Sequence, residues 1–132
     1  MPNAVFEVDA SGTFVGSSYI YATARDFARY GLLQLQDGVF NGERILPEGW
    51  VSFSTSPNTQ SKGEYGSLFW LNKSGKMPSA PDDMYWCQGY DGQRIFIIPS
   101  KDLIVVILGF SHKPKNEMNC DALLGDILKT IN

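Results

Sequence analysis

Residues 84–108 read MYWCQGYDGQRIFIIPSKDLIVVIL, and this stretch decides the fold. It holds three strand-like runs, at 84–87, 94–98 and 103–108, which are joined by two short turns. Turns this short make neighbouring strands antiparallel. The second and third runs are almost continuously apolar, which is typical of a sheet covered on both faces. The stretch therefore predicts an α+β fold with an antiparallel sheet of three to four strands flanked by helices.

Two helical patterns lie on either side of this stretch. The first begins after Thr23, a good N-cap with Asp26 three residues on, and ends at Asp37-Gly38. The second spans 116–131 and has an apolar stripe at helical spacing, so it can cover one face of the sheet. The other face is covered either by the first helix or by a layer that this chain does not contain. The remaining predicted elements are an extended segment at 4–8, a packed loop at 12–21, a turn at Asn41-Gly42, a short helix at 47–54 starting with Pro47, a strand at 67–72 and a loop at 73–83.

Length and composition are those of a single domain. The chain has 132 residues, 43% of them hydrophobic, and a formal net charge of −3. A chain of this size builds one modest core, so we predict a single domain over residues 1–132. The charge gives no basic surface of the kind that nucleic acid requires. No apolar run approaches the ~20 residues of a transmembrane helix. No secretory signal is visible, and the compartment is unassigned.

Cysteine and histidine are too few and too scattered to predict a metal site. Cys87 falls in a strand pattern and Cys120 in a helix pattern, and we interpret them as two separate buried thiols rather than a disulfide or a reactive pair. His112 is the single histidine, and we expect it to be solvated in a loop. Without paired Cys or His ligands a zinc site is not expected. We predict no metal and no cofactor.

The turn Gly89-Tyr90-Asp91-Gly92-Gln93 is the candidate functional stretch. Two glycines within four residues allow backbone N–H groups to approach a ligand at the end of a strand. The same residues also describe an ordinary hairpin turn, with Tyr90 and Gln93 as surface side chains. Composition and spacing do not decide between these two interpretations.

An ordered set of motifs resembles the β-lactamase-related serine hydrolases. Residues 18–33 (SYIYATARDFARYGLL) resemble the family's "sTArDlARfgll" helix, and GERILP at 42–47 is similar to the segment that follows it. YGSLFWLN at 65–72 resembles the "YG.gfWln" strand. GYDGQ at 89–93, with the apolar runs after it, resembles the "GhdGq...iP..dlvvv" hairpin. Within the family, the chain is most similar to class C-like esterases and 6-aminohexanoate-oligomer hydrolases.

The resemblance implies a site at the candidate turn, in an incomplete β-lactamase/transpeptidase-like fold. Tyr90-Asp91-Gly92 stands where the family has its K-T-G or H-x-G motif. The implied oxyanion donor is the backbone N–H of Gln93, and Tyr90 is implied to hydrogen-bond the substrate. Tyr90, Asp91, Gly92 and Gln93 are thus the implied substrate-binding residues, with Gln93 and Tyr90 catalytic. Because Tyr90 is uncharged at neutral pH, small-molecule esters or uncharged amides are expected as substrates rather than anionic drugs.

The family's nucleophile motif, S-x-x-K, does not occur in this sequence. The closest match, at 59–62, begins with Thr59 and lies in a polar stretch. Tyr65-Gly66-Ser67 resembles the family's second motif but begins a strand pattern, and Lys73-Ser74-Gly75 resembles the third but reads as a turn. Ser17 and Ser18 are interpreted as loop caps that could edge a pocket, and Trp70 and Trp86 as core or pocket lining.

We therefore expect the chain to be the C-terminal portion of a larger serine hydrolase domain and inactive alone. It would pair with the missing N-terminal part or form a dimer. The alternative is a non-catalytic binding or interaction module derived from the same fold.

Overall fold

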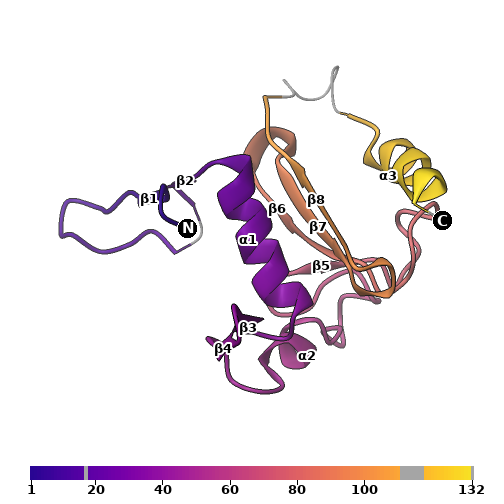
Figure 1. Cartoon of the computed structure of the whole chain (residues 1–132), viewed down its shortest axis with the longest axis horizontal. Coiled ribbons are helices and arrows are strands. Elements are labelled where there is room, and N and C mark those ends of the chain that lie inside the picture. The colour runs from indigo at the N-terminus through magenta and orange to yellow at the C-terminus, as the bar shows by residue number, and fades with distance from the viewer. Residues whose placement is uncertain (17, 111–117, 132) are drawn as a thin grey trace.

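The computed structural model describes residues 1–16, 18–110 and 118–131. At its centre lies an antiparallel sheet with the strand order β5-β6-β7-β8 (Figure 1). The strands are β5 (Trp70–Leu71), β6 (Tyr85–Gln88), β7 (Arg94–Ile98) and β8 (Leu103–Ile107). The predicted α+β class and the four-stranded antiparallel sheet are therefore confirmed.

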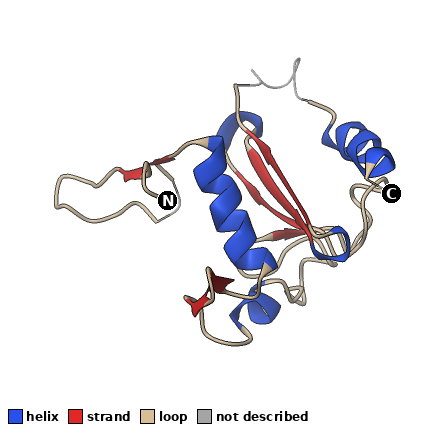
Figure 2. Ribbon diagram, in the orientation of Figure 1, coloured by secondary structure: helices blue, strands red, loops and turns tan. Residues whose placement is uncertain are grey.

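Two helices lie on opposite faces of this sheet and give the molecule three layers (Figure 2). They are α1 (Ala24–Leu35) and α3 (Cys120–Thr130). The smaller elements are the hairpins β1 (Val5–Phe6) with β2 (Ile20–Tyr21) and β3 (Val39–Phe40) with β4 (Glu43–Arg44), the short helix α2 (Trp50–Ser54), and two 3₁₀ turns, η1 (Tyr90–Gly92) and η2 (Pro99–Lys101). None of the described helices is long and apolar enough to cross a membrane.

Strand β7 separates two hydrophobic cores, because all five of its residues are buried. Its alternate side chains point to opposite faces, as the pleat of a strand requires. Phe96 and Ile98 pack with the α3 side, in a cluster that includes Trp86, Leu124 and Leu128. Ile95 and Ile97 pack with the α1 side, in a cluster that includes Leu71, Tyr85, Phe27 and Tyr30. The continuous apolar pattern thus correctly predicted a sheet covered on both faces.

Helix α1 covers the face that the sequence left unassigned. It approaches closely at Gly31, where an added Cβ would lie 2.8 Å from Ile104 Cγ2 and 3.3 Å from Ile95 Cγ2. At its N-terminus the Asp26 N–H donates to Thr23 Oγ1 at 3.1 Å, so the predicted cap is confirmed. The cap and the glycine together fix how α1 lies on the strands.

The carboxylate of Asp26 is fully buried at this cap. It accepts hydrogen bonds from Thr23 Oγ1 at 2.9 Å and from Arg29 Nη1 at 2.8 Å. Burial by itself raises the pKa of this carboxyl, but the bonds from Thr23 and Arg29 outweigh burial and hold the pKa below its ordinary value. The folded state therefore favours the ionised form of the Asp26 carboxyl.

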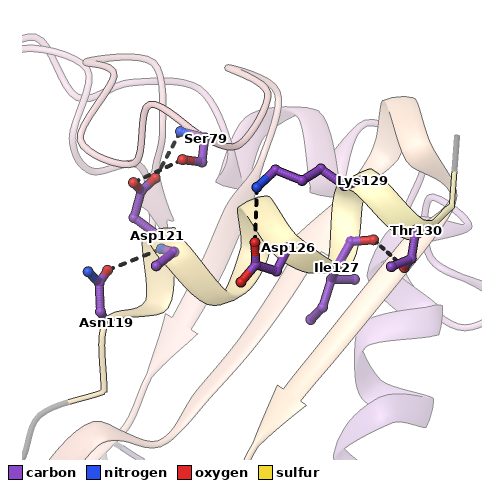
Figure 3. A network of polar contacts seen from close by, with 8 residues as sticks. Ser79, Asn119, Asp121, Asp126, Ile127, Lys129 and Thr130 are labelled. Atoms are coloured by element: carbon purple, nitrogen blue, oxygen red, sulfur yellow. Dashed lines mark hydrogen bonds and ion pairs between the residues drawn. The ribbon is translucent and has the colours of Figure 1, made fainter.

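Helix α3 is fastened to the loop between β5 and β6 by a polar network (Figure 3). The Asp121 carboxylate accepts from the Ser79 N–H at 2.8 Å and from Ser79 Oγ at 3.0 Å. Asn119 caps the helix by accepting from the Ala122 N–H at 3.1 Å. Because Asn119 is the cap, the helix begins at Cys120 rather than near the predicted residue 116, although residues 116 and 117 lie outside the described part.

Three other predicted elements differ in the structure. The strand predicted at 67–72 is reduced to β5, because Leu68 adopts a positive φ of 75° and turns the chain. The helix predicted to start at Pro47 starts at Trp50, because Gly49 before it is left-handed with φ 77°. The loop predicted at 12–21 contains β2, which pairs with β1 in a projecting hairpin (Figure 1). The turn at Asn41-Gly42 is confirmed between β3 and β4.

Candidate active site

The candidate turn at 89–93 joins β6 to β7 at the end of the sheet where α1 begins (Figure 1). The last paired residues below it are Gln88 and Arg94. Strand β8 leaves the sheet at the same end, because Ile107 pairs with Arg94. The start of one helix, one turn and the exit of one strand therefore meet at this edge.

The backbone of the turn is tightly folded. Tyr90–Gly92 forms the 3₁₀ turn η1, and the Gly89 N–H donates to the Gln93 carbonyl at 2.9 Å. Asp91 lies in the left-handed region at φ 60° and ψ 32°, a conformation that Asp tolerates better than most residues. Gly92 follows with φ 99°, which favours glycine. Gln93 then returns to extended geometry at φ −67° and ψ 140°.

The residues of the turn differ strongly in exposure. Tyr90 is 84% exposed, whereas Asp91 beside it is only 8% exposed. Gln93 is half-buried. The sequence grouped these residues as one substrate-binding set, and the structure leaves Tyr90 on the surface and buries Asp91.

The backbone N–H of Gln93 is available as a donor. Within the described part of the chain, no hydrogen bond is found for this N–H, although the neighbouring Gly89 N–H is bonded. Backbone N–H groups in folded proteins are nearly always paired with protein or water. The Gln93 N–H, which directly follows Gly92 at the end of the turn, can therefore donate to water or to a ligand oxygen.

Arg94 is a residue near this site that sequence reasoning missed. It is only 6% exposed, and its Nη1 donates to the Gln93 carbonyl at 2.8 Å. A hydrogen bond from a charged donor is shorter and stronger than one between neutral groups. The signal in the sequence is a charged residue that opens the otherwise apolar run at 94–98.

Cys87 lies close to the turn, but its thiol is unreactive. Burial raises the pKa of its thiol to about 11, although a hydrogen bond with Tyr30 acts in the opposite direction. The reactive form of cysteine is the thiolate, so this side chain stays protonated and unreactive at neutral pH. Cys87 packs with the α1-side core and Cys120 with the α3-side core, so the two form no disulfide.

The other candidates lie away from the turn or in structural roles. Ser61 lies in a loop and donates through Oγ to the Asn58 and Tyr65 carbonyls at 2.8 Å, whereas Lys73 lies in an exposed turn. Trp86 is 1% exposed in the core and stacks on Trp70, with ring centroids 6.3 Å apart. Ser17 and His112 lie outside the described residues. Among the described residues, no group of three His, Cys, Asp or Glu side chains is arranged to hold a metal ion.

Comparison with known proteins identifies the family. The family model described as Beta-lactamase matches residues 2–128. The chain belongs to the β-lactamase family. It is 28% identical over 120 residues to the 6-aminohexanoate-dimer hydrolase of Paenarthrobacter ureafaciens, covering 80% of this chain and 29% of that protein. An uncharacterised protein of Alkalihalophilus pseudofirmus is 27% identical over 97 residues, with 66% of this chain and 29% of that protein covered.

Solved structures show the same fold. A Bacillus anthracis protein assigned as a 6-aminohexanoate-dimer hydrolase superposes with a TM-score of 0.74 at 24% identity, over 96% of this chain and 33% of that one. A Bacteroides dorei protein assigned as a β-lactamase gives a TM-score of 0.57 at 12% identity, over 95% of this chain and 44% of that one. This β-lactamase-family chain thus spans about a third of the length of the curated relatives it matches.

Proposed function

We propose that this chain supplies the oxyanion and substrate-binding strand of a serine hydrolase that cleaves ester or amide bonds. The S-x-x-K nucleophile would be contributed by residues outside the chain, so the chain alone does not turn over. The Gln93 N–H would stabilise the oxyanion, and Tyr90, Asp91 and Gly92 would contact the substrate. The observation that carries this proposal is the Gln93 N–H, which has no acceptor among the described residues and stands beside Gly92.

The substrate class follows from the character of Tyr90. Its phenol is 84% exposed, so it can reach a ligand that lies against the turn. A phenol donates a hydrogen bond but carries no positive charge at neutral pH. An ester or an uncharged amide therefore suits the proposed site better than a substrate that needs a cationic anchor. One matched relative is a hydrolase of the 6-aminohexanoate dimer by name, and this agrees with the proposed hydrolase class.

The proposed domain assignment treats residues 1–132 as the C-terminal portion of a larger hydrolase domain. Among the described residues, β8 pairs with β7 alone, and its residues are only half-buried. An open apolar strand edge readily pairs with another strand. The proposed occupant is the N-terminal part of the hydrolase or, in its absence, a second copy of the chain. Sedimentation equilibrium of the isolated chain tests the second case. A chain that stays monomeric at all concentrations would contradict pairing with a second copy.

The donor role of Gln93 can be tested by deleting only the N–H. Proline lacks this hydrogen and needs φ near −65°, which Gln93 already has at −67°. The host is a chimera in which this chain replaces the segment it matches in the Paenarthrobacter hydrolase. Gln93→Pro should lower kcat by about 100- to 1000-fold relative to Gln93→Ala, which loses the same side chain but keeps the N–H. Equal kcat values for the two variants would refute the oxyanion role.

A non-catalytic binding or interaction module is the second candidate. It is favoured by the two well-packed cores, in which Phe96, Ile97 and Ile98 are 0% exposed. A standalone module predicts a cooperative thermal transition for the isolated chain and no exposed apolar sheet surface. A hydrolase portion predicts marginal stability and binding of a hydrophobic dye. In both cases a fluorophosphonate probe should leave the chain unlabelled, and labelling of a serine here would refute our placement of the nucleophile.

A further inference from the structure

The proposed oxyanion donor lies in an exposed turn, so its direction must be held by contacts outside the tip of that turn. An oxyanion donor is effective because it is aimed before the reaction begins. Tyr90, in the middle of the turn, is 84% exposed and offers little support. The contacts of the Gln93 peptide and side chain must therefore hold the direction of this N–H.

The carbonyl of Gln93 is held from two directions. The Gly89 N–H donates to it at 2.9 Å across the base of the turn. Arg94 Nη1 donates to it at 2.8 Å, from a guanidinium that is almost completely buried. These two donors fix the peptide that follows Gln93, and they leave its own N–H to be fixed from the other side.

The side chain of Gln93 provides a second set of contacts. Its Nε2 donates to the Gly109 carbonyl at 3.4 Å, just beyond the end of β8. The same side chain lies over Gly89, where an added Cβ would be 2.8 Å from Gln93 Oε1 and 3.1 Å from Gln93 Cβ. One side chain thus spans from the start of the turn to the exit of β8.

We infer that the Gln93 side chain is a positioning group for its own backbone N–H. This inference rests on the proposed function, because it takes that N–H as the oxyanion donor. The side chain restrains rotation about the Cα of Gln93 by bonding to Gly109 and packing on Gly89. A Cβ at position 89 would push the Gln93 side chain out of this place. Gln93 therefore has two separate tasks, donation by the backbone and alignment by the side chain.

Gly89 allows the alignment to be tested without straining the backbone. Its φ is −90°, a value that alanine adopts readily, so Gly89→Ala acts only through the Gln93 side chain. Gly92, at φ 99°, would not serve, because alanine is strained there. Gln93→Leu keeps a branched apolar side chain at this position and removes the amide, including the Nε2 donor to Gly109. In the Gln93→Ala background, Gly89→Ala should have no further effect.

The experiment titrates the 132-residue chain with methylphosphonate, a small tetrahedral oxyanion, and follows backbone amides by NMR. In the unaltered chain the Gln93 amide should shift in a saturable way. The amide of Gly42 is the internal control, because it lies in the β3–β4 turn at the other end of α1 (Figure 1). Gly89→Ala and Gln93→Leu should each raise the dissociation constant measured at the Gln93 amide by roughly two- to tenfold, the range for one neutral hydrogen bond.

The possible outcomes separate this inference from the proposed function. If the Gln93 amide responds in the unaltered chain and the variants bind equally well, the alignment role is wrong and the donor role stands. If the variants melt at lower temperature but bind equally well, the side chain is merely structural and the inference is again overturned. If the Gln93 amide does not respond in the unaltered chain, the donor assignment itself is wrong, and the inference falls with it.

Discussion

Replacing Asn72 by aspartate should detach the loop that joins β5 to β6. Asn72 is 1% exposed and is bonded on both sides of its amide. Its Nδ2 donates to the carbonyls of Met77 at 2.9 Å, Ala80 at 3.0 Å and Pro81 at 3.0 Å. Its Oδ1 accepts from the Met77 N–H at 2.8 Å. Aspartate keeps the acceptor and turns the donor into an oxygen that faces three carbonyl oxygens.

The magnitude follows from the bonds lost and the charge buried. The Asn72 amide has two donor hydrogens and one accepting oxygen in use, so Asn72→Ala removes about three net bonds, or ~3 kcal/mol of unfolding free energy. Asn72→Asp at neutral pH instead leaves a buried charge without a partner, which costs ~3–5 kcal/mol. Either loss is a large share of the ~5–15 kcal/mol that stabilises a typical domain.

The effect of the aspartate variant should depend on pH. Burial against carbonyl oxygens raises the pKa of the introduced carboxyl above its unfolded value of ~3.9. A raised folded pKa means that the protonated form is favoured in the native state. Stability is therefore greatest below ~4 and is lost as the pH rises through the folded pKa. Asn72→Asp should accordingly lose stability relative to Asn72→Ala as the pH rises from about 3.5 to about 7.

Urea unfolding followed by tryptophan fluorescence measures these differences, because Trp86 is buried in the α3-side core. The matched control is Asn58→Asp, at an exposed asparagine whose Oδ1 accepts from the Gln60 N–H at 3.0 Å and which can keep that bond as aspartate. The reasoning is refuted if the free energy of unfolding of Asn72→Asp lies within ~0.5 kcal/mol of that of the unaltered chain at pH 7, as it would for an ordinary surface substitution.

Two further predictions concern α1. Gly31→Ala gains ~1 kcal/mol of helix propensity, yet its Cβ would lie 2.8 Å from Ile104 Cγ2. Overpacking costs ~1–3 kcal/mol, so the variant should be less stable in urea. In an Ile104→Ala background, which removes the clashing methyl group, Gly31→Ala should cost less than it does in the unaltered chain. Because the pKa of Asp26 is lowered on folding, its stabilisation is present above pH ~4 and lost as the pH falls further. Asp26→Asn should flatten that acid dependence, and an unchanged slope would contradict this account.

Local patterns predicted the parts of the structure that depend on neighbouring residues. The apolar runs at 94–98 and 103–108 became β7 and β8, because a strand buried on both faces needs no alternation. Thr23 capped α1, and Asn41-Gly42 closed a two-residue hairpin with both residues at positive φ. Prediction failed where a local signal was overruled, as at Pro47, where the left-handed Gly49 delays α2.

The candidate site also has features that the sequence predicted and features that only the structure shows. The sequence by itself determined where the turn lies, because glycines between two strand runs mark a place where backbone N–H groups are accessible. Only the tertiary structure decided that Asp91 is buried, that Arg94 donates a hydrogen bond to the Gln93 carbonyl, and that the Gln93 side chain reaches Gly109. Contacts between Gln93 and Gly109 join residues 16 positions apart, and they exist only when β6, β7 and β8 lie side by side. Spacing along the chain carries no record of such contacts, since the register of the strands sets them.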